Sequence, residues 1–251
     1  MNDASAPTKW LFGHYTYSVY SRIMEIAAII AFLGGLAYLV FNMVTTFDPA
    51  IADQLFWLMP AGVFAGLLVA DFSAGMVHWL ADNFGDEDMP VLGAMFIRPF
   101  REHHTDPKGI TRHDFIEVNG NNCIVLLLFG FPVLLLVPDT GLIGAFFEVV
   151  LLTHFLGIFA TNQIHKWSHM DNPPLVVRGM MKVGLIMSVD HHNVHHTIPH
   201  DRYYCITTGW MNPILEKLDF FPRLERFIRA YWPWADPEPH AKRMHGFQSE
   251  T

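Results

Sequence analysis

Long apolar runs separated by polar stretches are the clearest pattern along the chain. Four runs stand out, although the third is short and contains Pro132. They cover residues 26–47, about 55–80, about 123–137 and about 142–164. Since about 20 apolar residues cross the hydrocarbon core of a bilayer, the pattern predicts an all-α integral membrane protein with about four transmembrane helices. A short amphipathic stretch at 176–187 is expected to lie in the membrane interface.

Composition supports a membrane protein. Of 251 residues, 51% are hydrophobic and 16% are charged, whereas soluble domains carry about 25% charged residues. The mean hydropathy is +0.24, and the net charge of −8 argues against a nucleic-acid partner. The two cysteines, Cys123 and Cys205, have no metal-binding spacing and make no disulfide framework, which fits reducing surroundings. The first twenty residues lack the apolar core and cleavage site of a signal peptide.

Positive charges lie on one side of the predicted membrane. All 16 lysines and arginines fall within 1–22, 81–122 or 165–251, and the only charges of the loops at 48–54 and 138–141 are acidic. Because positive residues favour the cytoplasmic face, both termini and the middle loop are predicted there. The membrane would be a bacterial inner membrane or, in a eukaryote, the endoplasmic reticulum. The histidine-rich segments fall on this same side, which predicts a helical cap.

Histidines gather in three short segments of that cap. The chain has 15 histidines, and the groups are His103-His104, His165 with His169, and His191-His192-Asn193-Val194-His195-His196 followed by His200. On a helix, 165/169, 191/195 and 192/196 are i,i+4 pairs whose imidazoles share one face. Neutral imidazoles bind transition metals, and with only two cysteines they favour iron over a thiolate zinc site or an iron–sulfur cluster. The alternative for the last group is a solvated histidine-rich loop.

The second span carries a polar stripe that leads to these histidines. Asp71, Gly75, His78 and Asp82 are spaced i, i+4, i+7 and i+11, which places them on one helix face. Because an ionisable residue inside a span is a functional candidate by default, His78 is expected to be a ligand and Asp82 a ligand or its support. Asp71 is expected to orient the site from deeper in the membrane, or to hydrogen-bond to a neighbouring helix.

Further polar residues accompany these groups. Asn162 is expected to support the site through its amide, whereas His113 suits the surface as well as the metal site. His154 lies eleven residues before His165, about 16 Å along a helix, which is too far for one metal site and suits a polar contact or a substrate channel. Basic residues of the middle loop are candidates for binding a phosphate, with membrane anchoring as the alternative. They are Arg98, Arg101, Lys108 and Arg112.

Five continuous runs of the sequence resemble those of one known family. They are residues 71–79 (DFSAGMVHW), 96–104 (FIRPFREHH), 111–117 (TRHDFIE), 161–169 (TNQIHKWSH) and 205–210 (CITTGW). On these runs the chain resembles the Kua/CarF lipid-desaturase family, whose best-defined members are plasmanylethanolamine desaturases, from about residue 60 to about 220. The last two runs are more similar to the plasmalogen branch than to the plastid members, which desaturate an acyl chain.

The resemblance implies a di-iron membrane enzyme with one lipid-desaturase domain at 1–251, a core at about 20–220 and a C-terminal tail at 221–251. It would convert a 1-O-alkyl ether phospholipid into the 1-O-alk-1′-enyl vinyl ether, with O2 and two electrons from an external carrier of the cytochrome b5 or ferredoxin kind. The implied iron ligands are His78, His103, His104, His165, His169, His192, His195 and His196. Next in line are His191, His113, His200 and Asp82.

Other functions are compatible with the same residues. A fatty-acyl phospholipid desaturase or hydroxylase would use the same iron site, and analysis of the lipid product would separate it from an ether-lipid desaturase. A non-catalytic membrane protein that transports metal would be expected to place ligands along a path through the bilayer, whereas these histidines gather at one face. A zinc-stabilised scaffold would differ in its metal content.

Overall fold

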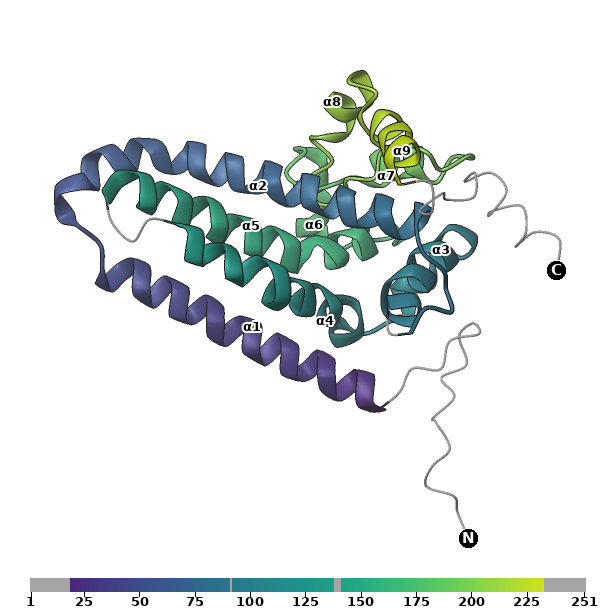
Figure 1. Ribbon diagram of the computed structural model, residues 1–251, viewed down its shortest axis with the longest axis horizontal. Helices are drawn as coiled ribbons and strands as arrows, with labels where there is room; N and C mark the ends of the chain where they lie inside the picture. The colour runs from purple at the N-terminus through teal and green to yellow at the C-terminus, as the bar shows by residue number, and fades with distance from the viewer. Residues whose placement is uncertain (1–18, 91, 138–140, 233–251) are drawn as a thin grey trace, which may run out of the picture.

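Four long helical segments form an elongated bundle (Figure 1). The computed structural model describes residues 19–90, 92–137 and 141–232, and within them every regular element is helical. The long segments are α1 (Val19–Thr45), α2 (Ala52–Asn83), α4 (Phe115–Val125) with its continuations η4 (Leu126–Gly130) and η5 (Phe131–Leu136), and α5 (Gly141–Ser168). Each segment is long and apolar enough to cross a membrane. The protein is therefore an integral membrane protein with an all-α fold, as the apolar runs predict.

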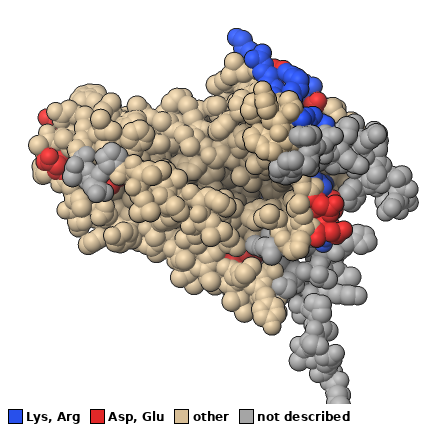
Figure 2. All heavy atoms as spheres, viewed as in Figure 1, with Lys and Arg blue, Asp and Glu red and all other residues tan. Residues whose placement is uncertain are grey.

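Short helices gather toward one end of this bundle and form the cap (Figure 1). They are α3 (Arg98–Thr105), α6 (Leu175–Lys182), α7 (Val189–His195), α8 (Asn212–Lys217) and α9 (Phe220–Tyr231). Single helical turns lie in the connections, namely η1 (Pro49–Ile51), η2 (Gly93–Ile97) and η3 (Gly109–Arg112). On the face shown in Figure 2, lysine and arginine lie at the cap end and the middle of the bundle is almost free of charge. This distribution suits a hydrocarbon-facing belt with an interfacial cap.

The third span begins earlier than the apolar pattern predicts. Helix α4 starts at Phe115 rather than near residue 123, because Asp114 caps its first turn by accepting two backbone N–H hydrogen bonds. One of its polar residues bonds to a neighbouring helix: Asn122 Nδ2 donates to the Ile158 carbonyl oxygen on α5 at 2.9 Å. A hydrogen bond between helices removes much of the cost of placing an amide in the membrane.

Helices α2 and α5 cross closely, and glycines permit the approach. A Cβ atom at Gly66 would lie 2.6 Å from both Thr153 Cβ and the Val150 carbonyl oxygen. One at Gly157 would lie 2.6 Å from Ala70 Cβ. Small residues at a helix crossing let two backbones come together in the bilayer. This crossing fixes the relative position of the two spans that carry histidines into the cap.

We expect Gly66→Ala to destabilise the bundle, since the added methyl group would push α2 and α5 apart. Overpacking of this kind costs about 1–3 kcal/mol, which should lower the apparent melting temperature of the detergent-solubilised protein. Gly34→Ala in α1 is the matched control, because a Cβ atom there meets nothing within 4 Å. Equal melting temperatures for the two variants would contradict the close crossing.

Helix α9 extends the folded cap beyond residue 220, the boundary that the family resemblance implies. The Phe221 side chain is buried, and its ring centroid lies 5.6 Å from that of Trp79 and 4.8 Å from that of Tyr204. The folded cap therefore continues as far as Tyr231. The tail from residue 233, both termini and the loop at 138–140 lie outside the described residues.

Candidate metal centre

The cap end brings together histidines from four helices. Helix α2 runs on to Asn83 and α5 to Ser168, so their last two turns carry His78 and His165 to the cap end, and His169 follows directly after α5. Helices α3 and α7 supply the others, namely His103, His104, His192 and His195, with His196 directly after α7. Two membrane helices and two cap helices must therefore all be in place before the site is complete.

The first ligand group contains five histidines. They are His103, His165, His169, His192 and His196, and one ring nitrogen of each lies within 4.8 Å of the others. His192 Nε2 is 2.9 Å from His165 Nε2 and 3.0 Å from His196 Nε2. Two nitrogens bound at right angles to one ion at about 2.1 Å would lie about 3.0 Å apart. These imidazoles are thus spaced as ligands of a single metal ion.

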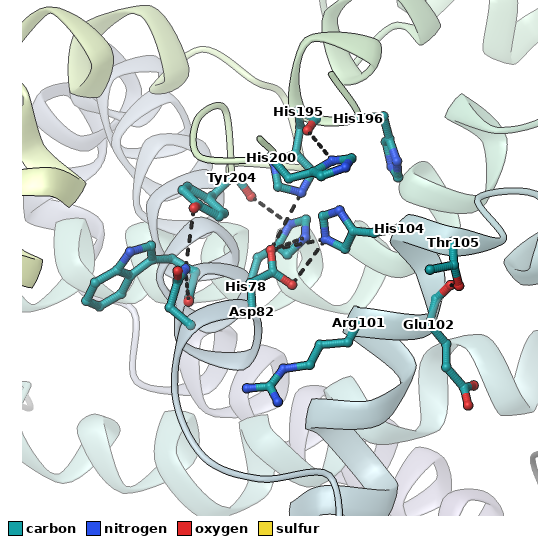
Figure 3. Close-up of polar contacts among 12 residues, drawn as sticks. His78, Asp82, Arg101, Glu102, His104, Thr105, His195, His196, His200 and Tyr204 are labelled. Atoms are coloured by element: carbon teal, nitrogen blue, oxygen red, sulfur yellow. Dashed lines mark hydrogen bonds and ion pairs between the residues drawn. The ribbon is translucent and has the colours of Figure 1, made fainter. Parts of the chain in front are cut away.

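The second ligand group contains a carboxylate. His78, Asp82, His104 and His195 are all buried, and their ligand atoms also lie within 4.8 Å of one another. Asp82 lies at the centre of the group (Figure 3), with carboxylate oxygens 3.2 Å from His104 Nε2, 3.4 Å from His78 Nε2 and 3.6 Å from His195 Nε2. The polar stripe of α2 therefore ends in a site of mixed nitrogen and oxygen donors, which suits iron.

A third set, His104, His196 and His200, joins the other two. His104 also belongs to the second group, and His196 also belongs to the first. The two groups are therefore neighbours that share their boundary. Together they could hold two metal ions side by side.

Backbone carbonyl groups fix the orientation of several rings. His78 Nδ1 lies 3.1 Å from the Tyr204 carbonyl oxygen, and His195 Nδ1 lies 2.8 Å from that of Arg202 (Figure 3 shows the first). A carbonyl oxygen can only accept, so Nδ1 carries the proton and Nε2 keeps its lone pair for a metal. The segment after α7 thus selects the tautomer of two rings that come from different helices.

Burial keeps the cap imidazoles neutral. It lowers the pKa of His192 and His195 well below the ordinary histidine value, and neighbouring imidazoles lower it further. Burial also lowers the pKa of His169 to about 4. Because these rings are neutral in the folded protein, acid below the ordinary histidine pKa of about 6.5 works against both folding and metal binding.

Several ring nitrogens in the two groups are buried without a hydrogen-bond partner. They include Nε2 of His78, His103, His169 and His195. An unsatisfied buried polar atom costs about 1–3 kcal/mol, and so many in one place would oppose folding. A transition metal ion accepts lone pairs of this kind, so the residues fit a metal centre.

Other predicted residues lie outside the two groups. His113 Nδ1 pairs with Glu117 at 2.6 Å, and the His191 ring packs on Tyr203 and faces the Asn212 amide at 3.1 Å. The side chains of His191 and His192 point in different directions, because adjacent positions on a helix are about 100° apart. Neither His113 nor His191 belongs to a ligand group within the described residues.

Two polar residues of the spans hold the backbone instead of a metal. Asp71 is fully buried and accepts hydrogen bonds from backbone N–H groups of the segment 207–211. Asn162 Nδ2 donates to the Val118 carbonyl oxygen on α4 at 2.9 Å. Both therefore secure the elements that carry or surround the histidines.

The four basic residues proposed for phosphate binding are engaged by groups of the protein. Arg98 contacts the Glu87 carbonyl oxygen and Asp88, and Arg101 donates to the carbonyl oxygens of Phe84 and Gly85. Lys108 pairs with Asp171 at 2.6 Å, and Arg112 pairs with Asp106. A phosphate role for any of them would have to compete with these partners.

A large cavity opens beside the histidines. Its volume is about 1200 Å³, and its lining runs from His103 and His165 to His154 and Phe129, with α2, α4 and α5 all contributing. Apolar residues of the spans gave no sequence signal for it, because residues that face a cavity and residues that face lipid are of the same types. His154 was a cavity residue of the spans that the sequence did indicate, since an ionisable residue inside an apolar run is a functional candidate.

The histidine groups at the end of a bundle of membrane helices could hold metal ions beside a large cavity, as expected of a membrane metalloprotein. Residues 67–235 match the lipid desaturase domain. The chain therefore belongs to the lipid desaturase family. No solved structure matches the chain.

Curated relatives agree with this placement. The chain is 48% identical over 212 residues to a plasmanylethanolamine desaturase of Myxococcus xanthus, covering 84% of this chain and 73% of the relative. It is 47% identical over 183 residues to plasmanylethanolamine desaturase 1 of Mus musculus, covering 69% of this chain and 66% of the relative. It is also 36% identical over 166 residues to the chloroplastic fatty acid desaturase 4 of Arabidopsis thaliana, covering 64% of this chain and 49% of the relative.

Proposed function

We propose that the protein is a plasmanylethanolamine desaturase with two iron ions in its histidine groups. The observation that carries this proposal is the placement of two adjacent ligand groups beside a large cavity. His103 and His165 belong to the first group and also line the cavity. The two relatives with this name share nearly half of their aligned residues with the chain. Two neighbouring imidazole-rich positions with one carboxylate suit iron.

The proposed reaction removes two hydrogen atoms from the ether-linked alkyl chain. The C1′–C2′ single bond of a 1-O-alkyl phospholipid becomes a double bond, O2 is reduced to two water molecules, and an external carrier supplies two electrons while the medium supplies two protons. The iron ions would supply the activation of O2 and the removal of hydrogen. The protein would hold the chain beside the metal and keep bulk water away from it.

Individual residues take defined roles in this proposal. The eight histidines predicted from the sequence would bind the irons, together with Asp82 and His200, which share their ligand groups. We place the cap and both termini on the cytoplasmic side, because the basic residues fall there. Electrons would come from a soluble or membrane-bound one-electron carrier of the cytochrome b5 or ferredoxin kind.

Other functions fit less well. A fatty-acyl desaturase would use the same ligands, but the relatives of that name are less similar to this chain than the two plasmanylethanolamine desaturases. A metal transporter needs ligands along the bundle, and the ligand groups of the described residues all lie at the cap end.

The test is expression in a host that lacks vinyl ethers, grown with a 1-O-alkylglycerol precursor. Mild acid releases a fatty aldehyde from each vinyl ether, so the aldehyde yield measures the product. We expect aldehyde from cells that make the protein, and about two iron ions per chain in the purified sample. Well-expressed, iron-loaded protein that yields no aldehyde with a competent electron donor would contradict the proposal, and a new double bond in an acyl chain would point to the alternative.

A further inference from the structure

The cavity changes character along its length. Near the histidines its lining includes charged and polar side chains, among them Glu102, Arg112 and Asn121. Toward the other end the lining is apolar, with Leu126 of η4, Val133 of η5 and Leu151 of α5. One end therefore suits a polar head group, and the other suits a hydrocarbon chain.

The depth of the cavity matches one leaflet of a membrane. His165 and His154 both line it and stand eleven residues apart on the continuous helix α5, which corresponds to about 16 Å. Half of a bilayer's hydrocarbon core is about 15 Å. An extended alkyl chain that starts at the metal groups would thus end close to His154.

Small residues keep the middle of the cavity open. Ser73 and Ala74 of α2 line it, and so does Gly130 at the end of η4. A Cβ atom at Gly130 would lie 3.0 Å from Leu126 and 3.1 Å from Phe155, so a larger residue there would crowd the packing behind the cavity wall. Small side chains therefore line part of the passage from the histidines to the far end of the cavity.

We propose that this cavity binds the sn-1 ether-linked alkyl chain of one phospholipid, with Leu151 and Val133 at its far end limiting the length of chain that the protein accepts. The proposal rests on the proposed function, because it takes the chain to be the one that is desaturated. The glycerol and head group stay at the polar mouth, which places the first carbons of the chain beside His103 and His165.

Substitutions of Leu151 that shorten or lengthen the cavity test the role of its far end. Leu151→Trp would shorten the cavity, so we expect the ratio of octadecyl to tetradecyl aldehyde to fall at least about tenfold, since an apolar pocket discriminates by that much for a group that does not fit. Leu151→Ala would lengthen it and raise the ratio. Leu156→Trp is the matched control on the same helix, because Leu156 is 45% exposed and does not line the cavity. Its aldehyde profile should match that of the unaltered protein.

A second measurement does not depend on activity. A 1-O-alkyl phospholipid with a diazirine at the end of its alkyl chain would be photolysed with the purified protein, and the labelled peptides would be mapped. We expect label on the segments around Val133 and Leu151, and loss of that label in Leu151→Trp. If labelling succeeds while no vinyl ether forms, the proposed reaction fails and the chain-binding site stands.

Three results would overturn the proposal. One is an unchanged aldehyde profile in active Leu151→Trp and Leu151→Ala variants. Another is a shift in the sn-2 acyl chains of the product without a shift in the aldehydes, which would assign the cavity to the other chain. The third is photolabel spread evenly over the lipid-facing residues of α1 and α5.

Discussion

His192→Ala is expected to abolish vinyl ether formation and to lower the bound iron, while His191→Ala keeps both. His192 Nε2 stands within 3.0 Å of ring nitrogens from α5 and from the residue after α7, so its loss removes the ligand that joins them. Loss of a residue that merely supports a ligand costs about 10–100-fold, and the loss of His192 itself should exceed that range.

The neighbouring residue makes this comparison informative. His191 has the same side chain one position earlier, but it packs on Tyr203 outside the ligand groups. Aldehyde yield and iron content per purified chain would be measured for both variants. Equal loss in the two would mean that the pair acts as a unit, contrary to the geometry. Retained iron in His192→Ala would remove His192 from the ligand set.

Asp71→Ala should prevent the protein from accumulating in a folded form. The Asp71 carboxylate accepts hydrogen bonds at 2.8–3.1 Å from the backbone N–H groups of four residues in the segment between α7 and α8. They are Thr207, Thr208, Gly209 and Met211. Each donor left buried and unsatisfied costs about 1–3 kcal/mol, and the total approaches the whole stability of a typical domain.

Asp71→Asn separates the charge from the shape of this residue. The amide keeps one acceptor oxygen, which can still serve the three donors that meet Oδ1, but its NH2 group would face the backbone N–H of Met211. We expect intermediate yield and an intermediate melting temperature, measured by size exclusion of the solubilised protein after heating. Normal yield and melting temperature in Asp71→Ala would show that these hydrogen bonds do not hold the cap.

The apolar pattern located the spans because membrane insertion depends on local composition. It placed the start of α4 too late, since Asn119, Asn121 and Asn122 read as loop residues. In the structure, amides such as Asn122 donate to carbonyl oxygens of an adjacent helix. The partner of a polar residue on another helix cannot be read from the periodicity of its own helix.

The sequence likewise indicated the histidine ligands but not how they are grouped. Spacing and the family resemblance predicted the eight histidines that lie together in the structure, because residues on one helix face stay together wherever the helix lies. The division into two groups was not visible, since it depends on how α3 and α7 approach the two spans. The partners of Asp71 were hidden for the same reason, because they lie 136–140 residues further along the chain.

The dependence of the site on four separate helices has a consequence for the cell. Spans inserted by the translocon need no iron, but the cap gathers several buried ring nitrogens whose lone pairs the proposed iron ions would satisfy. Metal binding and closure of the cap would then share one free energy. Under iron starvation the chain would remain membrane-inserted with an open cap, a state that proteases recognise. The supply of iron would then set the lifetime of the protein as well as its catalytic rate. The ether-lipid composition of the membrane would follow the iron status of the organism.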